Sequence, residues 1–274
     1  MRIPPAILTL LAGMVLVLAG LWVGQNVNLL PVDASVNAPV YDELFKVLFS
    51  IGTILFIGIV GLIVYSLVRF RRRQGDSTDG EAVEGNLPLE ILWTAIPAVV
   101  VLFVGIYSYD IYDRMGGMAP LNDHSMHAMS AEMGGDGRTW AGISPVSLAA
   151  DGGPPPLPID VTAMQFAFIF HYPDSNITSG ELHVPAGVPV ALQMKANDVI
   201  HAFWVPQFRL KQDVIPGQPT LLSFTATRTG RYPIVCAELC GPYHGGMRST
   251  VIVEEPETFE AWVAQNAPAA PVQS

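Results

Sequence analysis

The sequence has few charged residues. Lys, Arg, Asp and Glu make up 14% of its 274 residues, whereas soluble globular chains usually carry about 25%. This deficit excludes an ordinary cytosolic enzyme and a disordered protein, which both need a polar composition. The two cysteines are too few for a disulfide-rich scaffold. Basic residues are also scarce, and the formal net charge of −10 argues against a nucleic-acid partner.

Three long uncharged runs account for the missing charge, at residues 7–23, 48–68 and 91–109. A helix needs about 20 apolar residues to cross the hydrocarbon core of a bilayer. The second and third runs therefore predict transmembrane helices over 48–69 and 87–109. The first run is at the lower limit of length, so residues 1–24 are either a signal sequence or an extra N-terminal helix.

Arginines orient these helices. Arg69, Arg71, Arg72 and Arg73 follow the second run, and loops rich in positive charge lie on the cytoplasmic side of a membrane. We therefore expect residues 70–86 to be a cytoplasmic loop. The segment 25–47 and everything after residue 109 are then external.

A Gly-, Met-, His- and Pro-rich linker is expected over residues 110–158. It contains five methionines and two histidines, namely Met115, Met118, Met126, Met129, Met133, His124 and His127. Two interpretations stay open. The linker is a flexible tether, or it is a loose Cu(I)-handling segment, because thioether ligands select soft copper.

Short β-type runs follow the linker, at residues 159–172, 188–194, 221–225, 231–236 and 249–253. Gly and Pro turns separate them, a pattern typical of an antiparallel sandwich or barrel. We therefore expect one all-β domain over 159–255, followed by a short helix and a C-terminal tail over 256–274.

Metal-binding side chains gather in one stretch of twelve residues, which contains Cys236, Cys240, His244 and Met247, with His201 upstream. This set of soft and borderline ligands favours copper. A mononuclear blue-copper site uses a single cysteine, so one thiolate is in excess. The economical solution is two copper ions bridged by both sulfurs, each with one histidine. Met247 is then a weak ligand of one ion, and the backbone carbonyl of Glu238 serves the other.

Two alternatives remain for the cysteines. The external compartment is oxidising, so Cys236 and Cys240 could form a disulfide. A structural zinc site is the other alternative, although methionine is a poor zinc ligand. His171 and His183 have no partner ligands nearby in the sequence, and we expect them to be ordinary surface or edge residues.

The chain resembles subunit II of cytochrome c oxidase, the subunit with the binuclear copper-A centre. Matching motifs occur at residues 89–97, 198–206, 211–217, 180–185 and 236–245, and the last two are most similar to the cyanobacterial branch. The resemblance implies a membrane-anchored all-β protein. Its two transmembrane helices form a hairpin, followed by a cupredoxin-like Greek-key β-barrel or sandwich.

The resemblance also implies roles for individual residues. The copper ligands would be His201, Cys236, Cys240, His244 and Met247 by side chain, and Glu238 by its carbonyl oxygen. The Glu238 carboxylate would bind a magnesium ion shared with the catalytic subunit, as a hard ligand for a hard cation. Glu90 would lie at the cytoplasmic mouth of a proton pathway in that subunit. From the sequence alone, Glu90 is also an acidic residue that the helix dipole favours at a helix start.

One departure from the family concerns the point where electrons arrive. The family has Gln-Trp-x-Trp there, and this chain has Gln165, Phe166, Ala167 and Phe168. Phe166 is therefore the candidate for receiving the electron, with core packing as the alternative role.

The resemblance implies an electron-transfer subunit of a proton-translocating cytochrome c oxidase, with no catalytic residue of its own. Its partners would be the catalytic haem-copper subunit I, subunit III, membrane lipid and a soluble cytochrome c-type donor. It would lie in the plasma or thylakoid membrane, with the copper domain on the periplasmic or lumenal side. Alternatives are a membrane-anchored copper-delivery chaperone and the copper-A domain of a nitrous oxide reductase-like enzyme.

Overall fold

A computed structural model describes residues 4–72, 74–75, 78–80, 84–116, 140–141 and 155–268. The chain forms two compact units. The first comprises Met1–Leu29 and Asp42–Tyr109, and the second comprises Leu30–Tyr41 and Asp110–Ser274. The Met- and His-rich part of the linker, from Met118 to Met133, lies outside the described residues, and so does the copper-handling hypothesis that concerns it.

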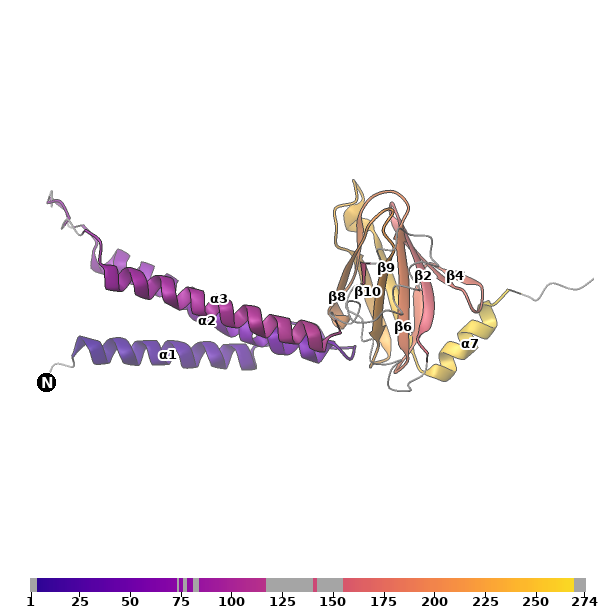
Figure 1. Cartoon of the computed structure of the whole chain (residues 1–274), viewed down its shortest axis with the longest axis horizontal. Coiled ribbons are helices and arrows are strands. Elements are labelled where there is room, and N and C mark those ends of the chain that lie inside the picture. Colours follow the sequence, from indigo (N-terminus) through magenta and orange to yellow (C-terminus); the bar gives the residue numbers. More distant parts are fainter. Residues whose placement is uncertain are drawn as a thin grey trace, which may run out of the picture. The chain divides into compact units, whose positions relative to one another are not determined.

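Three helices dominate the first unit (Figure 1): α1 (Pro5–Asn26), α2 (Ala38–Arg69) and α3 (Leu87–Arg114). In the part of the chain that the structure describes, all three are long and apolar enough to cross a membrane. α1 covers the residues for which a signal sequence or an extra N-terminal helix was expected, so the described residues contain three apolar helices where the resemblance implied two. The uncharged residues on both sides of the run 7–23 extend it to a helix of 22 residues, which is about 33 Å long.

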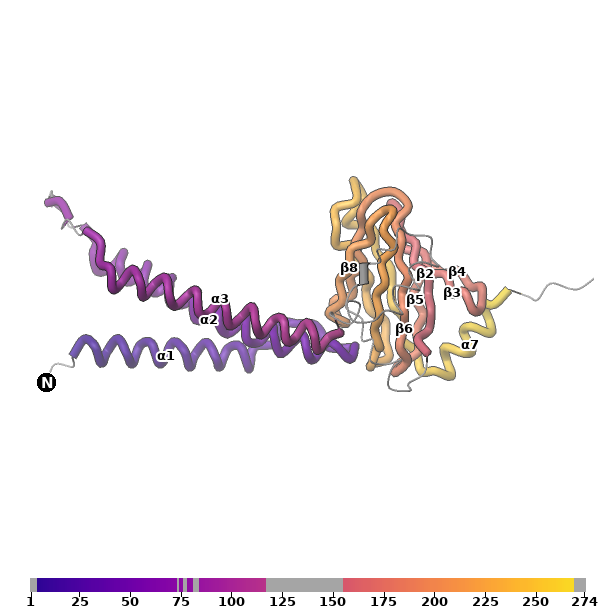
Figure 2. The backbone as a smooth tube through the Cα atoms, in the orientation of Figure 1, coloured from indigo at the N-terminus to yellow at the C-terminus, as the bar shows by residue number. Residues whose placement is uncertain are grey.

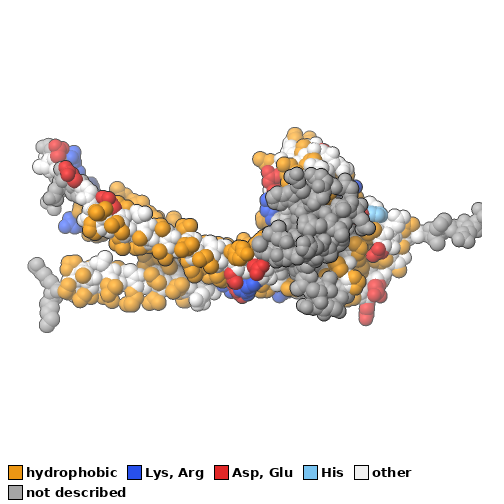
Figure 3. All heavy atoms as spheres, in the orientation of Figure 1, with side chains coloured by type: hydrophobic (Ala, Val, Ile, Leu, Met, Phe, Trp, Pro, Cys, Tyr) orange, Lys and Arg blue, Asp and Glu red, His pale blue; other side chains and the backbone are white. Residues whose placement is uncertain are grey.

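The helices also extend beyond their apolar runs. α2 begins at Ala38, so it includes the last part of the segment 25–47 that was expected to be external. α3 continues to Arg114, five residues past the expected end. Apolar content defines the part of a helix that fits a bilayer, but polar residues can continue the same helix into water. Figure 3 shows hydrophobic side chains over most of the length of these helices, with charged side chains mainly at their ends.

α1 packs closely on α2 through two glycines one helical turn apart. A Cβ atom on Gly20 would overlap the side chain of Ile54, and one on Gly24 would overlap the Ser50 hydroxyl. The backbone carbonyl oxygen of Lys46 would lie 2.9 Å from the Cβ added at Gly24. Small residues permit such a close approach between membrane helices. These contacts hold α1 against α2.

Gly24→Leu is therefore expected to separate α1 from α2. The larger side chain meets both Ser50 and the Lys46 backbone, and overpacking of this kind costs about 1–3 kcal/mol. Gly13→Leu is the matched control, because nothing lies within 4 Å of a Cβ at that position of the same helix. Thermal unfolding of the full chain in detergent measures the difference. Equal midpoints for the two variants would contradict the packing of α1 on α2.

Strands arranged in two β-sheets form most of the second unit, and the path of its backbone can be followed in Figure 2. Their strands are β1 (Trp140–Ala141), β2 (Leu157–Met164), β3 (Ala167–Tyr172), β4 (Ile177–Ser179), β5 (Leu182–Pro185), β6 (Pro189–Ala196), β7 (His201–Val205), β8 (Leu210–Val214), β9 (Thr220–Thr225), β10 (Gly230–Cys236) and β11 (Arg248–Glu254). Among the described residues, one sheet has the order β1-β9-β6-β2-β3-β4 and the other β5-β11-β10-β7-β8. Short 3-10 helices η1 (Pro206–Phe208) and η2 (His244–Gly246) and the helix α7 (Pro256–Asn266) complete the unit.

The cupredoxin-like sandwich is confirmed, but it is not purely antiparallel. β2 pairs with β6 in parallel, and so does β5 with β11. Parallel neighbours need long crossover connections, which alternation of apolar residues within single strands does not reveal. The inner side chains form one core that contains Phe168, Phe170, Phe203, Phe208 and Phe224.

The run at 159–172 is two strands rather than one. β2 and β3 pair antiparallel from Asp160 with His171 to Met164 with Ala167. Gln165 and Phe166 form the turn between them. Neither residue is one of the common turn formers Gly, Pro, Asn, Asp and Ser, so the sequence carries no common turn signal here.

The segment before α2 is joined to the sandwich by hydrogen bonds. The Ala34 amide donates to the Gln207 carbonyl, and the Ala34 carbonyl accepts from the Thr227 amide. The Ser35 hydroxyl donates to the Phe208 carbonyl at 2.9 Å. Ala34 is fully buried in the core. Residues 30–37 are therefore part of the β-domain.

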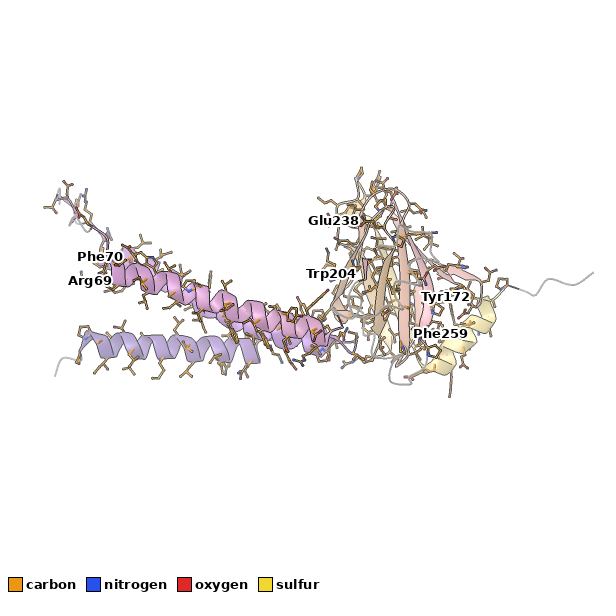
Figure 4. The ribbon with its side chains drawn as sticks, in the orientation of Figure 1. Arg69, Phe70, Tyr172, Trp204, Glu238 and Phe259 are labelled. Atoms are coloured by element: carbon orange, nitrogen blue, oxygen red, sulfur yellow. The ribbon has the colours of Figure 1, made fainter. Side chains whose placement is uncertain are left out.

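α7 covers one end of the sandwich and buries His183. The His183 ring stacks on Trp262 at 4.1 Å between centroids, and its Nδ1 lies 3.3 Å from a Glu254 carboxylate oxygen. The Tyr172 hydroxyl accepts from the His183 amide and donates to the His183 carbonyl. Figure 4 shows Tyr172 near Phe259 of α7. His183 was expected to be an ordinary surface or edge residue. It lies on β5, an edge strand of its sheet, but its side chain is buried because its partners come from distant strands and from α7.

Tyr172 is expected to make the domain sensitive to alkali. Burial raises the pKa of Tyr172 well above its usual value, so the folded protein holds the phenol neutral when an unfolded tyrosine would ionise. The stability that it contributes is complete below about pH 10 and is lost as the pH rises further, by about 1.4 kcal/mol per pH unit.

Tyr172→Phe removes this ionisation but also two hydrogen bonds, so it should be less stable than the wild type at pH 8, by about 1–3 kcal/mol. The gap should narrow by pH 11. Pulse proteolysis of the full chain in increasing urea measures both values. A gap that stays constant between the two pH values would count against the buried neutral phenol.

Candidate metal centre

Two neighbouring strands bring the ligand-type residues together. His201 begins β7 and Cys236 ends β10, and these strands pair antiparallel, with Phe203 opposite Cys236. The loop after β10 carries Cys240, and η2 begins with His244. Met247 follows just before β11. The Cys236 amide donates to the Met247 carbonyl at 3.1 Å, which closes this loop at its base.

The six predicted site residues of the copper cluster converge. Ligand atoms of His201, Cys236 and Cys240 all lie within 4.8 Å of one another. The contacts are Cys236 Sγ to Cys240 Sγ at 3.8 Å, Cys236 Sγ to His201 Nδ1 at 3.9 Å, Cys240 Sγ to His244 Nδ1 at 3.6 Å, Cys240 Sγ to Met247 Sδ at 3.8 Å, and Cys236 Sγ to the Glu238 carbonyl oxygen at 3.3 Å. In Figure 4, Glu238 lies at one end of the sandwich.

Both cysteines are free thiols in the structure. A disulfide needs sulfurs about 2.05 Å apart, and these are 3.8 Å apart. Burial, together with the neighbouring Cys236 thiol, raises the pKa of Cys240 to about 11. A metal that binds here must therefore displace a proton.

Asp198 orients the upstream histidine. His201 Nε2 donates to Asp198 Oδ1 at 2.8 Å, and His201 Nδ1 faces the Cys236 sulfur at 3.9 Å. Burial alone would raise the pKa of Asp198, but hydrogen bonds from His201 and from the Gln165 and Val199 amides hold it at about 2. A carboxylate on the second ring nitrogen is a common way to fix the tautomer of a metal-binding histidine.

The donor set fits copper. Two thiols, two imidazoles, a thioether and one carbonyl oxygen are available in one buried cluster, and this softness favours copper over magnesium or calcium. Met247 and His201 are fully buried, so solvent does not reach the site at these two residues. The geometry supports neither a disulfide nor a purely structural role for the cysteines.

Sequence reasoning missed Gln165 and Asp198. The Gln165 amide nitrogen of the side chain donates to the Cys240 carbonyl at 2.6 Å, and its backbone amide donates to Asp198 Oδ2 at 2.7 Å. For Asp198 a signal was available, because it stands three residues before His201. Gln165 was noted only as part of the motif that departs from the family, and its contacts gave no signal because both partners are distant in the sequence.

The other two predicted site residues lie away from the cluster or at its edge. Phe166 packs at the edge: its ring contacts Tyr243 edge-to-face at 5.4 Å, and it lies next to Gly241. Glu90 is in the first turn of α3, where its carboxylate accepts from the Asn86 amide at 3.0 Å. This contact caps the helix start.

Comparisons with known proteins agree on one family. The family model "Cytochrome C oxidase subunit II, transmembrane domain" matches residues 20–111, and "Cytochrome C oxidase subunit II, periplasmic domain" matches residues 175–255. Cytochrome c oxidase subunit 2 of Thermostichus vulcanus is 51% identical, over 97% of this chain and 86% of that protein. The same subunit of a Synechocystis strain is 48% identical, over 98% of this chain and 85% of that protein.

Among solved structures, the periplasmic domain of subunit II of cytochrome oxidase of Bradyrhizobium japonicum is 31% identical. The match covers 41% of this chain and 95% of that chain, with a TM-score of 0.39.

Proposed function

The chain belongs to the cytochrome c oxidase subunit II family, and from this premise we propose that it carries electrons into the oxidase through two copper ions. The similarity to the cyanobacterial branch is confirmed by relatives that match nearly the whole chain. A copper-delivery chaperone of the expected kind would have a thioredoxin-like α/β fold, and the observed sandwich opposes it. A nitrous oxide reductase-like enzyme is not favoured either, because the family match includes the membrane region.

The observation that carries the proposal is that the two thiols lie next to each other and that each also lies next to a histidine. The two sulfurs lie 3.8 Å apart, and each faces a different histidine. The side chains of His201, Cys236, Cys240, His244 and Met247, with the Glu238 carbonyl, would hold the two ions. When bound, such a centre accepts and releases one electron at a time with little rearrangement.

The chain's own residues prepare the site for this role. Asp198 keeps the His201 Nδ1 atom free to bind, and the buried Met247 supplies a weak ligand that excludes water. The two thiols give up their protons when copper binds. A buried, preformed donor set keeps the structural change on electron transfer small.

Glu238 is proposed to act at two sites. Its carbonyl oxygen points to the Cys236 sulfur, while its side chain is only partly buried. The free carboxylate would bind a magnesium ion shared with the catalytic subunit. Glu238→Gln should then keep copper, because the carbonyl is unchanged, and should lose the magnesium, which Mn²⁺ substitution and electron-spin spectroscopy of the assembled oxidase detect.

The membrane orientation is also a proposal. Hydrogen bonds place residues 30–37 with the β-domain, and the arginines from Arg69 onward follow the other end of α2. Positive charge favours the cytoplasm, so the sandwich would lie on the periplasmic or lumenal side of a plasma or thylakoid membrane. α1 would then remain as a third spanning helix. Glu90, at the start of α3, would lie at the cytoplasmic side, where a proton pathway of the catalytic subunit could begin.

The partners proposed are subunits I and III of the oxidase and a soluble cytochrome c-type donor. From residue 159 onward the chain has ten acidic and six basic residues, which favours a basic donor through electrostatic steering. Leu239 and Tyr243, on the loop that carries the cysteines, are 84% and 71% exposed. Phe166, packed between Tyr243 and Gly241, is the proposed point where the electron arrives.

Metal analysis of the full chain tests the two-copper proposal. The chain, purified in detergent and loaded with copper under anaerobic conditions, should bind about two copper ions. After partial oxidation, its electron-spin spectrum should show one unpaired electron shared between two copper nuclei. A single copper with an unshared spectrum, or no copper, would overturn the proposal.

A further inference from the structure

We propose that Gln165 is a positioning residue that fixes the loop before His201 relative to the loop that carries Cys240. The inference rests on the proposed copper function and concerns the turn between β2 and β3. Neither loop belongs to that turn: His201 follows the loop 197–200, and Cys240 lies in the loop 237–243. Gln165 contacts both.

The first contact acts through Asp198. The Gln165 backbone amide donates to Asp198 Oδ2, and His201 Nε2 donates to the other oxygen of the same carboxylate, Oδ1. The carboxylate is therefore held between the turn and the histidine. A second backbone bond, from the Asn197 amide to the Ala163 carbonyl at 3.1 Å, fastens the same loop to the end of β2.

The second contact acts on the cysteine loop. Gln165 Nε2 donates to the Cys240 carbonyl at 2.6 Å. The next residue, Gly241, has a φ of +134°, a conformation that favours glycine. A Cβ atom there would lie 2.9 Å from Gln165 Nε2 and 3.2 Å from the Phe166 ring. The turn therefore packs directly on the backbone that follows Cys240.

Together the two contacts link the loop before His201 to the loop that carries Cys240. One residue fixes the His201 side through its main chain and the Cys240 side through its side chain. The hydrogen bond between Cys236 and Cys240 holds the sulfurs only to each other. The turn is therefore one of the links that set the distance between His201 and the Cys240 sulfur, beside the hydrogen bond from the Ala237 amide to the Ala202 carbonyl at 3.2 Å. That distance sets how well both sulfurs share the two ions.

Gln165→Met tests the role with little change in shape, because it removes the amide donor and keeps the length of the side chain. Loss of a partner in the outer shell of a metal site typically costs 10–100-fold in metal affinity. We expect copper to leave the variant at least about tenfold faster than the wild type when a chelator is added to the full chain in detergent. We also expect its electron-spin spectrum to show a less equal sharing of the electron.

Gln218→Met is the matched control, with the same exchange at an exposed glutamine in the turn between β8 and β9. It should release copper at the wild-type rate with an unchanged spectrum. A merely structural role for Gln165 would lower the melting temperature and leave the spectrum of the folded fraction as in the wild type. That result would overturn the proposal.

The outcomes separate this proposal from the copper proposal itself. If the wild type and Gln218→Met bind no copper pair, the copper function fails, and the positioning role fails with it. If they bind two ions and Gln165→Met matches them in release rate and spectrum, only the positioning role fails. Should Gln165→Met not fold, Gln165→Glu decides in the same assays, because it keeps the size of the side chain and replaces the donor by a negatively charged acceptor that repels the Cys240 carbonyl.

A double-mutant cycle with Asp198→Asn adds a further check. If Gln165 and Asp198 act through one turn, the double variant should release copper less quickly than the product of the two single effects predicts. Fully independent effects would contradict a shared positioning role.

Discussion

Cys240→Ser is expected to abolish the two-copper centre. The Cys240 sulfur lies within 4 Å of three other donors, namely Cys236 Sγ, His244 Nδ1 and Met247 Sδ. A serine hydroxyl is a hard ligand that stays protonated near neutral pH, so it cannot bridge two soft ions. The number of copper ions per chain should fall from about two to one or none. The shared-electron spectrum should disappear, and electron transfer should fall by more than the roughly 10–100-fold typical of an outer partner.

Met247→Leu is the matched comparison for this experiment. It removes a weak ligand and keeps both thiols, so both ions should remain while the reduction potential changes. Metal analysis and redox titration of the full chain measure both variants. A Cys240→Ser chain that keeps two copper ions would contradict the bridging role. Complete copper loss in Met247→Leu would make the thioether an essential ligand.

Phe203→Ala is expected to cause the largest loss of stability. Phe203 is fully buried, its ring meets Phe168 edge-to-face at 5.9 Å, and its backbone lies opposite Cys236. Removing a buried phenylalanine side chain costs about 3–5 kcal/mol. The variant should also bind copper more weakly, because the cavity lies beside the strand that positions Cys236.

Trp204→Ala is the control, because it also removes an aromatic side chain from β7. Trp204 follows Phe203 but is 39% exposed, so its loss should cost less than the loss of the fully buried Phe203. Pulse proteolysis of the full chain in increasing urea compares the two variants. Equal losses would mean that the core does not depend on Phe203 in the way the structure indicates.

Local sequence was enough for the features that depend on neighbouring residues. Apolar runs predicted α2 and α3, because composition over about 20 residues decides whether a helix fits a bilayer. Four of the metal-binding side chains lie within twelve residues, so their meeting in a single loop required no knowledge of the fold. Whether residues 1–24 form a signal sequence or a third helix stayed open, because their apolar run of 17 residues is near the lower limit of length.

Long-range contacts were out of reach. His183 is buried by Glu254, 71 residues away, and by Trp262 of α7. The partners of Gln165 lie 33 and 75 residues away. No periodicity within one strand reports such pairs, because they depend on which strands become neighbours in the two sheets.

The sequence alone determined two things: the three uncharged runs gave helices long enough to cross a membrane, and the spacing of Cys, His and Met gave a candidate soft-metal cluster. Both are properties of composition and short spacing, which hold in any fold that the chain adopts. Only the tertiary structure decided that α1 packs on α2, that β2 and β3 meet in a turn at Gln165, and that this turn reaches both ligand loops. The reason is physical: the turn contacts Asp198 and Cys240 only because the pairing of distant strands places it between them.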